Sequence, residues 1–195
     1  ANDMLPFGTE QAILEDGYRS LAHSLNVTKV AEENLRVVFG GPECKIPYSA
    51  SRLNISAMSF GALSATAIAA LNRGAGLGNF AHNTGEGSIS KQHLENGGDI
   101  IWQIGTGYFG CRNSDGSFCD ESFANRATDD VVKMIEVKLS QGAKPSHGGV
   151  LPGAKVTKEI AEIRLVDLGK TVFSPPTHPE FDSPMGLLQF VKRLR

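Results

Sequence analysis

The side chains best suited to chemistry gather in one short stretch of this 195-residue chain. An apolar run that starts at Met134 ends at Lys138, and a glycine-rich loop then carries Lys144 and His147. A lysine ammonium can hold negative charge on a ligand, and a histidine can exchange protons near neutral pH. A strand that delivers such residues into a loop is typical of the active sites of α/β barrels, which lie at the carboxyl ends of the strands.

Glu86 is a further candidate because a glycine stands on either side of it. Glycines without Cβ atoms let a ligand approach the backbone closely. The structural alternatives are an exposed turn carboxylate at Glu86, a salt bridge between Lys138 and Glu136, and a plain hydrogen-bonding role for His147. We expect His82 and His93 to be structural.

Other catalytic classes find little support in the sequence. Residues 105–110 match the G-x-G-x-x-G dinucleotide motif, but residues 111–116 predict a turn where that motif requires a helix. Nothing has the ligand spacing of a metal site, and no G-x-S-x-G nucleophile motif is present.

The elements that must position these residues alternate between strand and helix. Polar residues and glycines follow each predicted strand, as at the functional edge of a parallel sheet. Five strands fall short of the eight in a barrel of roughly 250 residues. We therefore predict an α/β fold of the parallel (β/α) TIM-barrel type with about five of eight strands. The strands are predicted at 53–58, 80–83, 100–104, 132–139 and 171–173, and helices at 8–25, 65–71, 121–127, after Thr157 and after Ser183.

This pattern divides the chain into two parts. Residues 1–52 are predicted to form a helix and an extended lead-in that packs on the barrel, and residues 53–195 the partial barrel itself. Hydrophobic residues make up 41% and charged residues 21%, which is a globular composition.

The composition also limits the partners. The net charge is −2 with scattered basic residues, which argues against nucleic-acid binding. No apolar run approaches the ~20 residues of a membrane span, and no signal peptide is visible. Three cysteines without tight spacing predict free thiols in the cytoplasm.

Several segments resemble the FMN-binding domain of glutamate synthase, and they occur in the family's order. The lead-in is most similar to the stand-alone bacterial group of FMN-binding glutamate synthase family proteins. The resemblance covers roughly residues 50–180. Its segments are ISAMSFGALS (55–64), NTGEGSIS (83–90), QIGTGYFG (103–110), EVKLSQGAKP (136–145), GGVLPG (148–153) and SPPTH (174–178).

The resemblance implies an FMN site. The backbone of Met58 and Ser59 would touch the isoalloxazine ring, and Gln103 and Lys138 would hold its pyrimidine edge. A lysine there favours the anionic reduced flavin. No iron–sulphur cluster is expected, because the cysteines do not match the family's cluster ligands, which lie later together with the phosphate site.

The resemblance also implies a substrate site. Glu86, Lys144 and Arg164 match the positions around the 2-oxoglutarate or imino-acid substrate, and an arginine suits a carboxylate. We take Glu86, Lys144 and His147 as the catalytic candidates. Val150 stands where the family has a substrate-binding glutamine, and Ser146-His147 replaces Gly-Glu. The predicted substrate is therefore glutamate or an N-substituted glutamate.

Three hypotheses follow. The first is an FMN-dependent oxidoreductase that moves hydride between flavin N5 and an imine of an amino acid or 2-oxo acid. The second is a truncated or split half-barrel, inactive by itself, which forms a homo-oligomer or needs a complementing C-terminal half. The third is another flavin barrel, such as a 2-hydroxy-acid oxidase, against which the loop after Lys138 argues.

Overall fold

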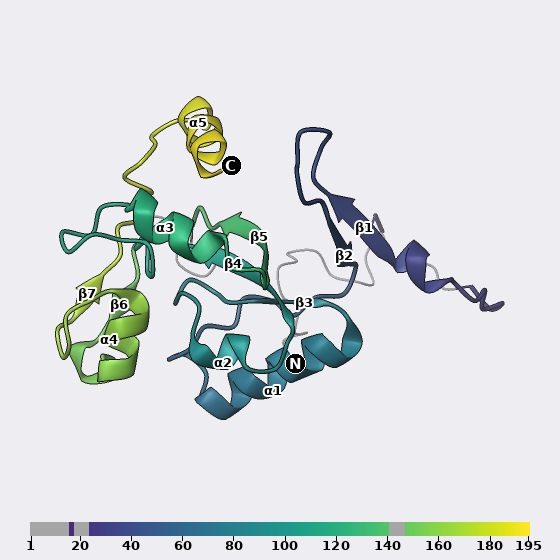
Figure 1. The fold of residues 1–195 in the computed structure, drawn as a ribbon, viewed down its shortest axis with the longest axis horizontal. Coiled ribbons are helices and arrows are strands. Elements are labelled where there is room, and N and C mark those ends of the chain that lie inside the picture. Colours follow the sequence, from purple (N-terminus) through teal and green to yellow (C-terminus); the bar gives the residue numbers. More distant parts are fainter. Residues whose placement is uncertain (1–15, 18–23, 141–146) are drawn as a thin grey trace. The chain divides into compact units, whose positions relative to one another are not determined.

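The computed structural model describes residues 16–17, 24–140 and 147–195. The chain forms two compact units, Ala1–Glu32 and Glu33–Arg195. The described strands and α-helices all belong to the second unit (Figure 1). The helix predicted over 8–25 lies almost entirely outside the described residues.

A three-stranded parallel sheet is the centre of the second unit. Its order is β3 (Ala81–Asn83), β4 (Asp99–Ile104) and β5 (Val132–Val137). The segment predicted as the first strand contributes a single parallel bridge, between Ile55 and His82 of β3. The predicted alternation of strands and helices along a parallel sheet is confirmed over this part of the chain.

The predicted helix starts after Thr157 and Ser183, and the cap at Ser64, are also confirmed. In each case the serine or threonine hydroxyl accepts a hydrogen bond from a backbone N–H in the first turn, which satisfies a donor that the helix leaves open. The helices are α1 (Ala65–Gly78), α2 (Lys91–Leu94), α3 (Asp120–Ala127), α4 (Lys158–Arg164) and α5 (Pro184–Leu194), with short 3-10 turns η1 (Glu32–Leu35) and η2 (Gly153–Lys155).

The predicted end of α1 at residue 71 is wrong. The helix continues to Gly78, and Asn79 ends it with φ 52°, a left-handed conformation that asparagine tolerates better than most residues. Gly74 lies within this helix and is not among the glycines with positive φ, so the backbone continues through it.

The lead-in forms an antiparallel hairpin of β1 (Arg36–Phe39) and β2 (Tyr48–Ser51). It is tied to the parallel sheet by the Tyr48 hydroxyl, which donates a 2.8 Å hydrogen bond to Asp99 at the start of β4. Burial and the neighbouring carboxylate raise the pKa of Tyr48 above its ordinary value, so this hydroxyl stays a donor.

The prediction that 171–173 is a fifth strand of the parallel sheet is wrong. These residues contribute β7 (Val172–Phe173), which pairs antiparallel with β6 (Val150–Leu151) in a separate two-stranded sheet. The chain reverses direction through α4 between the two segments, and segments that run in opposite directions pair antiparallel. The described parallel sheet therefore has three strands and the bridge at Ile55.

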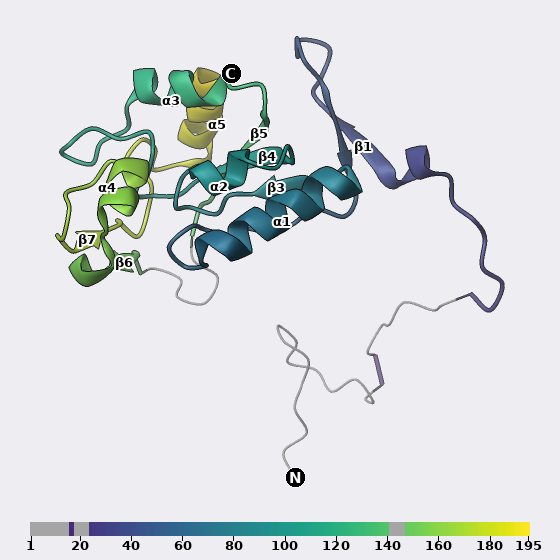
Figure 2. The same cartoon turned by 60° about the horizontal axis from the view of Figure 1, so that its bottom comes forward.

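One face of β4 builds the main core. Side chains alternate along a strand, so Ile100, Trp102 and Ile104 share a face, and all three are buried. Phe123 of α3 stacks on Trp102 with ring centroids 5.5 Å apart, and Phe190 of α5 belongs to the same cluster. Figure 2 shows α3 and α5 next to each other, and an ion pair between Asp120 and Arg193 joins them. The other face of the strand carries Asp99, Ile101 and Gln103. No helix in the described part of the chain is both long and apolar enough to cross a membrane.

Candidate functional site

Gln103 and Glu136 lie next to each other on adjacent strands, on the face opposite the main core. They are register partners in β4 and β5, and the Gln103 amide nitrogen donates to the Glu136 carboxylate. The Gln103 amide oxygen is buried and has no hydrogen-bond partner among the described residues. A buried acceptor without a partner is costly, so this oxygen is suited to receive a hydrogen bond from a ligand.

Lys138 and Glu86 form an ion pair at the carboxyl ends of two strands. Lys138 follows β5 directly, and its backbone N–H donates to the Ile104 carbonyl at the end of β4. Its ammonium nitrogen lies 3.4 Å from a carboxylate oxygen of Glu86, in the loop after β3. The two side chains are 26% and 34% exposed, so solvent screens the pair only in part.

The glycines beside Glu86 allow its loop to pack closely on other residues of the protein. Gly85 has φ +63°, and a Cβ there would stand 2.9 Å from the Ser59 backbone nitrogen. A Cβ at Gly87 would stand 3.0 Å from the Arg164 guanidinium. Loop, turn and arginine are therefore in close contact, and the space beside these glycines is filled by protein atoms.

Arg164 is buried at the end of α4, with 7% of its surface exposed. Its guanidinium donates a 2.9 Å hydrogen bond to the Phe60 carbonyl and lies over the Phe109 ring, 5.1 Å from the centroid. Burial lowers the pKa of Arg164, and the charge of Glu86 partly offsets that effect. An arginine keeps its proton under both influences, so a fixed cation faces the loop of Glu86.

Glu86 and Arg164 both line a cavity of about 200 Å³. Among the described residues that line it are two cations, Lys155 and Arg164, and one carboxylate, Glu86. This balance favours an anionic ligand. Glu86 also lines a smaller neighbouring cavity with Lys138 and His147. The other walls of the larger cavity include Ser59, Phe109, Val150, Leu151 and Ser174.

Of the residues predicted from the sequence, the structure brings together Ser59, Glu86, Lys138, His147 and Arg164 along these two cavities. Lys144 lies outside the described residues. Lys155, Phe109 and Ser174 were not predicted. Ser174 directly follows β7, so the rule that polar residues after strands form the site could have found it. Lys155 lies in η2, and nothing local distinguishes it from other surface lysines.

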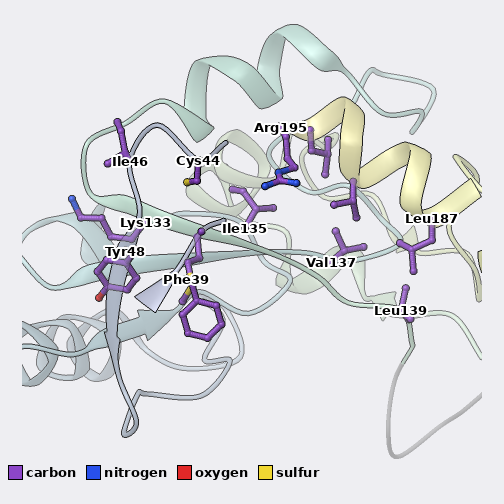
Figure 3. A pocket seen from close by; sticks show the side chains of 14 residues that line it. Phe39, Cys44, Ile46, Tyr48, Lys133, Ile135, Val137, Leu139, Leu187 and Arg195 are labelled. Atoms are coloured by element: carbon purple, nitrogen blue, oxygen red, sulfur yellow. The ribbon is translucent and has the colours of Figure 1, made fainter. Parts of the chain in front are cut away.

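A larger cavity of about 540 Å³ lies elsewhere in the second unit, between the β1–β2 hairpin, β5 and α5. Figure 3 shows Phe39, Ile135, Val137 and Leu187 pointing into it. Its walls are mainly apolar, and they include none of the residues predicted to bind cofactor or substrate. We therefore place the candidate site at the 200 Å³ cavity, where the carboxylate of Glu86 and the cations of Lys155 and Arg164 converge.

The chain is similar to known proteins over most of its length. The profile described as the conserved region in glutamate synthase matches residues 21–195. The glutamate synthase large subunit-like protein YerD of Bacillus subtilis is 44% identical over 160 residues, which cover 81% of this chain and 30% of YerD.

Two further relatives are more distant. The archaeal-type glutamate synthase [NADPH] of Thermotoga maritima is 34% identical over 72% of this chain and 25% of its own length. The archaeal glutamate synthase [NADPH] of Archaeoglobus fulgidus is 38% identical over 63% of this chain and 22% of its own length. The chain thus spans less than a third of these relatives.

Proposed function

Because the chain belongs to the glutamate synthase family, we propose that it supplies the flavin-ring and substrate side of an FMN-dependent oxidoreductase. The substrate would be an amino acid, glutamate or an N-substituted glutamate, or the corresponding 2-oxo acid. The observation that carries this proposal is the cavity in which Glu86 faces Arg164 and Lys155, beside the Glu86–Lys138 ion pair.

The residues present suit the ring of FMN. The unpaired buried oxygen of Gln103 offers an acceptor for a ring N–H, and Lys138 offers a cation at the end of the next strand. The backbone of Met58 and Ser59 follows the segment that bridges to β3 and would lie against the ring. Bound FMN supplies hydride transfer between N5 and an imine carbon. Beside it, Lys138 would stabilise negative charge on the pyrimidine edge.

The residues around the 200 Å³ cavity suit a substrate that carries carboxylates. Arg164 presents a rigid guanidinium, and Lys155 a second positive charge, so each could hold one carboxylate of a dicarboxylic amino acid. We propose that Glu86 accepts or donates a proton at the substrate nitrogen. We propose that Lys144 and His147 assist from the loop after Lys138.

Val150 makes the neighbouring wall apolar, and with Leu151 and Phe109 it supports a substrate with an apolar substituent. The family match supports a catalytic protein over an inactive half-barrel. We propose that residues 53–195 form part of a (β/α) barrel. The whole site would then need a second copy of this chain or a complementing C-terminal half. The free thiols of Cys44, Cys111 and Cys119 support a cytoplasmic location.

The test is a titration of the purified protein with FMN, followed by visible absorbance. The expected result is saturable binding with a shifted flavin spectrum, and bleaching of the flavin when glutamate or N-methylglutamate is added without oxygen. The matched control is Lys133→Met, since Lys133 is an exposed lysine of β5 that lies outside both polar cavities. An unchanged flavin spectrum at a large excess of FMN would contradict the proposal.

A further inference from the structure

His93 contacts a backbone carbonyl at the edge of the candidate site. It belongs to α2, and its Nε2 lies 3.2 Å from the Met58 carbonyl oxygen. Its Nδ1 receives the backbone N–H of Ser90 at 3.1 Å. A carbonyl can only accept and an amide N–H can only donate. Nδ1 must therefore be the bare nitrogen and Nε2 the protonated one, which defines a neutral ring with a known tautomer.

His178 makes the same kind of contact with the carbonyl of Lys138, which follows β5. Its Nε2 lies 2.8 Å from the Lys138 carbonyl oxygen, and its Nδ1 lies 3.1 Å from the Tyr108 hydroxyl. The Lys138 carbonyl requires a proton on Nε2, so in a neutral ring Nδ1 is bare and accepts the hydroxyl proton of Tyr108. His178 thus has the same neutral tautomer as His93, with the proton on Nε2.

Both rings are fixed by their surroundings. His93 is fully buried and His178 is 4% exposed. Phe181 stacks on His178 with ring centroids 4.9 Å apart. His93 is packed beside His82 of β3, at a centroid distance of 5.0 Å. A buried side chain that cannot change rotamer fixes the position of the atom to which it donates.

The two carbonyls belong to residues that frame the candidate site. Met58 directly precedes Ser59, which lines the 200 Å³ cavity. Lys138 carries the cation that pairs with Glu86. We propose that His93 and His178 are positioning residues, which set the backbone at Met58 and Lys138 through Nε2–H donors. The identity of the ligand near this backbone rests on the proposed function. The two hydrogen bonds from the histidines do not depend on it.

The electrostatics agree with this geometry. Burial lowers the pKa of His93 to about 4, and the hydrogen bond to Met58 opposes that shift in part. Burial also lowers the pKa of His178, with the Lys138 carbonyl acting in the opposite sense. The ionisable neighbours are His82 for His93 and Tyr108 for His178, and burial raises the pKa of Tyr108 to about 12. Both histidines are therefore neutral donors at neutral pH.

The first experiment is ¹⁵N NMR of the histidine side chains at pH 7. The expected spectrum has a protonated Nε2 and a bare Nδ1 on both His93 and His178. A proton on Nδ1 of either ring, or a doubly protonated ring, would overturn the proposal for that residue. This measurement needs no variant and no cofactor.

The second experiment compares two substitutions at each histidine. Glutamine can place its amide N–H where Nε2–H stands, whereas asparagine is too short to reach the carbonyl. We expect His93→Asn to speed hydrogen exchange at the amides of Met58 and Leu63 by about tenfold, and His178→Asn to do so at Lys138. His93→Gln and His178→Gln should stay within about threefold of the parent protein.

FMN affinity is the readout that connects these residues to the site. The asparagine variants should weaken FMN binding about tenfold, and the glutamine variants should not. If the parent protein binds no FMN, the proposed function fails while the NMR and exchange results still decide the positioning roles. Equal effects of glutamine and asparagine, or faster exchange throughout β4, would show that the histidines serve general stability only.

Discussion

The ammonium nitrogen of Lys138 lies 3.4 Å from a carboxylate oxygen of Glu86, so the end of β5 is joined to the loop after β3. The strand between them, β4, contributes Gln103 to the same face. An ion pair that is partly exposed adds only about 0.2–1 kcal/mol to stability. Its importance therefore lies in fixing one positive and one negative charge at the candidate site.

Replacing Lys138 tests this charge directly. Lys138→Met should weaken FMN binding at least about tenfold and lower the flavin reduction potential, because the cation that favours the anionic reduced ring is lost. The unfolding free energy should change by less than about 1 kcal/mol. Lys138→Arg keeps the charge and should retain most of the affinity. A titration and a redox potential measured on both variants check this, and equal behaviour of the two would contradict it.

Substitutions of Arg164 and Lys155 should separate the effect on substrate binding from the effect on stability. Arg164→Met removes the donor to the buried Phe60 carbonyl, so it should cost about 1–3 kcal/mol of unfolding free energy as well as raising KM for the amino acid. Lys155 is exposed, and Lys155→Met should raise KM with little change in stability. Urea unfolding and steady-state kinetics of both variants provide the comparison. An unchanged KM in both would exclude this cavity as the carboxylate site.

Gly85 should be intolerant of a side chain for two reasons. Its φ of +63° costs an alanine about 1–2 kcal/mol, and the new Cβ would stand 2.9 Å from the Ser59 nitrogen. Gly97 is the matched control, with φ +73° and open space around the Cβ position. We expect Gly85→Ala to be the more destabilising of the two in thermal unfolding. Equal losses would show that the loop and the turn at Ser59 are not in close contact.

Acid should destabilise the protein through the buried histidines. Burial lowers the pKa of both His82 and His93 to about 4, whereas an unfolded histidine titrates near about 6.5. The unfolded chain thus binds protons first. The stabilisation is complete above about pH 6.5 and is lost as the pH falls towards 4, by up to about 1.4 kcal/mol per pH unit for each histidine.

The variant His93→Gln isolates this effect. Urea unfolding at several pH values between 7 and 4.5 should show a shallower loss of stability in the variant, because one titrating group is gone. Carboxylates contribute equally to both curves and cancel in the difference. Parallel curves would mean that His93 titrates normally in the folded protein.

Much of the local structure could be predicted from short-range patterns. The hydroxyls of Ser64, Thr157 and Ser183 cap their helices as expected, and β4 and β5 lie where apolar runs predicted strands. These features depend on residues within one helical turn or one strand of each other, so their physical causes are visible in the sequence. The grouping of polar residues after strands likewise indicated Glu86 and Lys138.

What the sequence by itself determined, then, is the position of α1, α3, α4 and α5, of β3, β4 and β5, and of the polar residues that follow these strands. Only the tertiary structure decided that β7 pairs antiparallel with β6, that Arg164 donates to Phe60, and that His93 and His178 reach Met58 and Lys138. These contacts join residues far apart along the chain. Their partners are selected by the packing of whole elements, since a buried donor must find an acceptor wherever the fold places one.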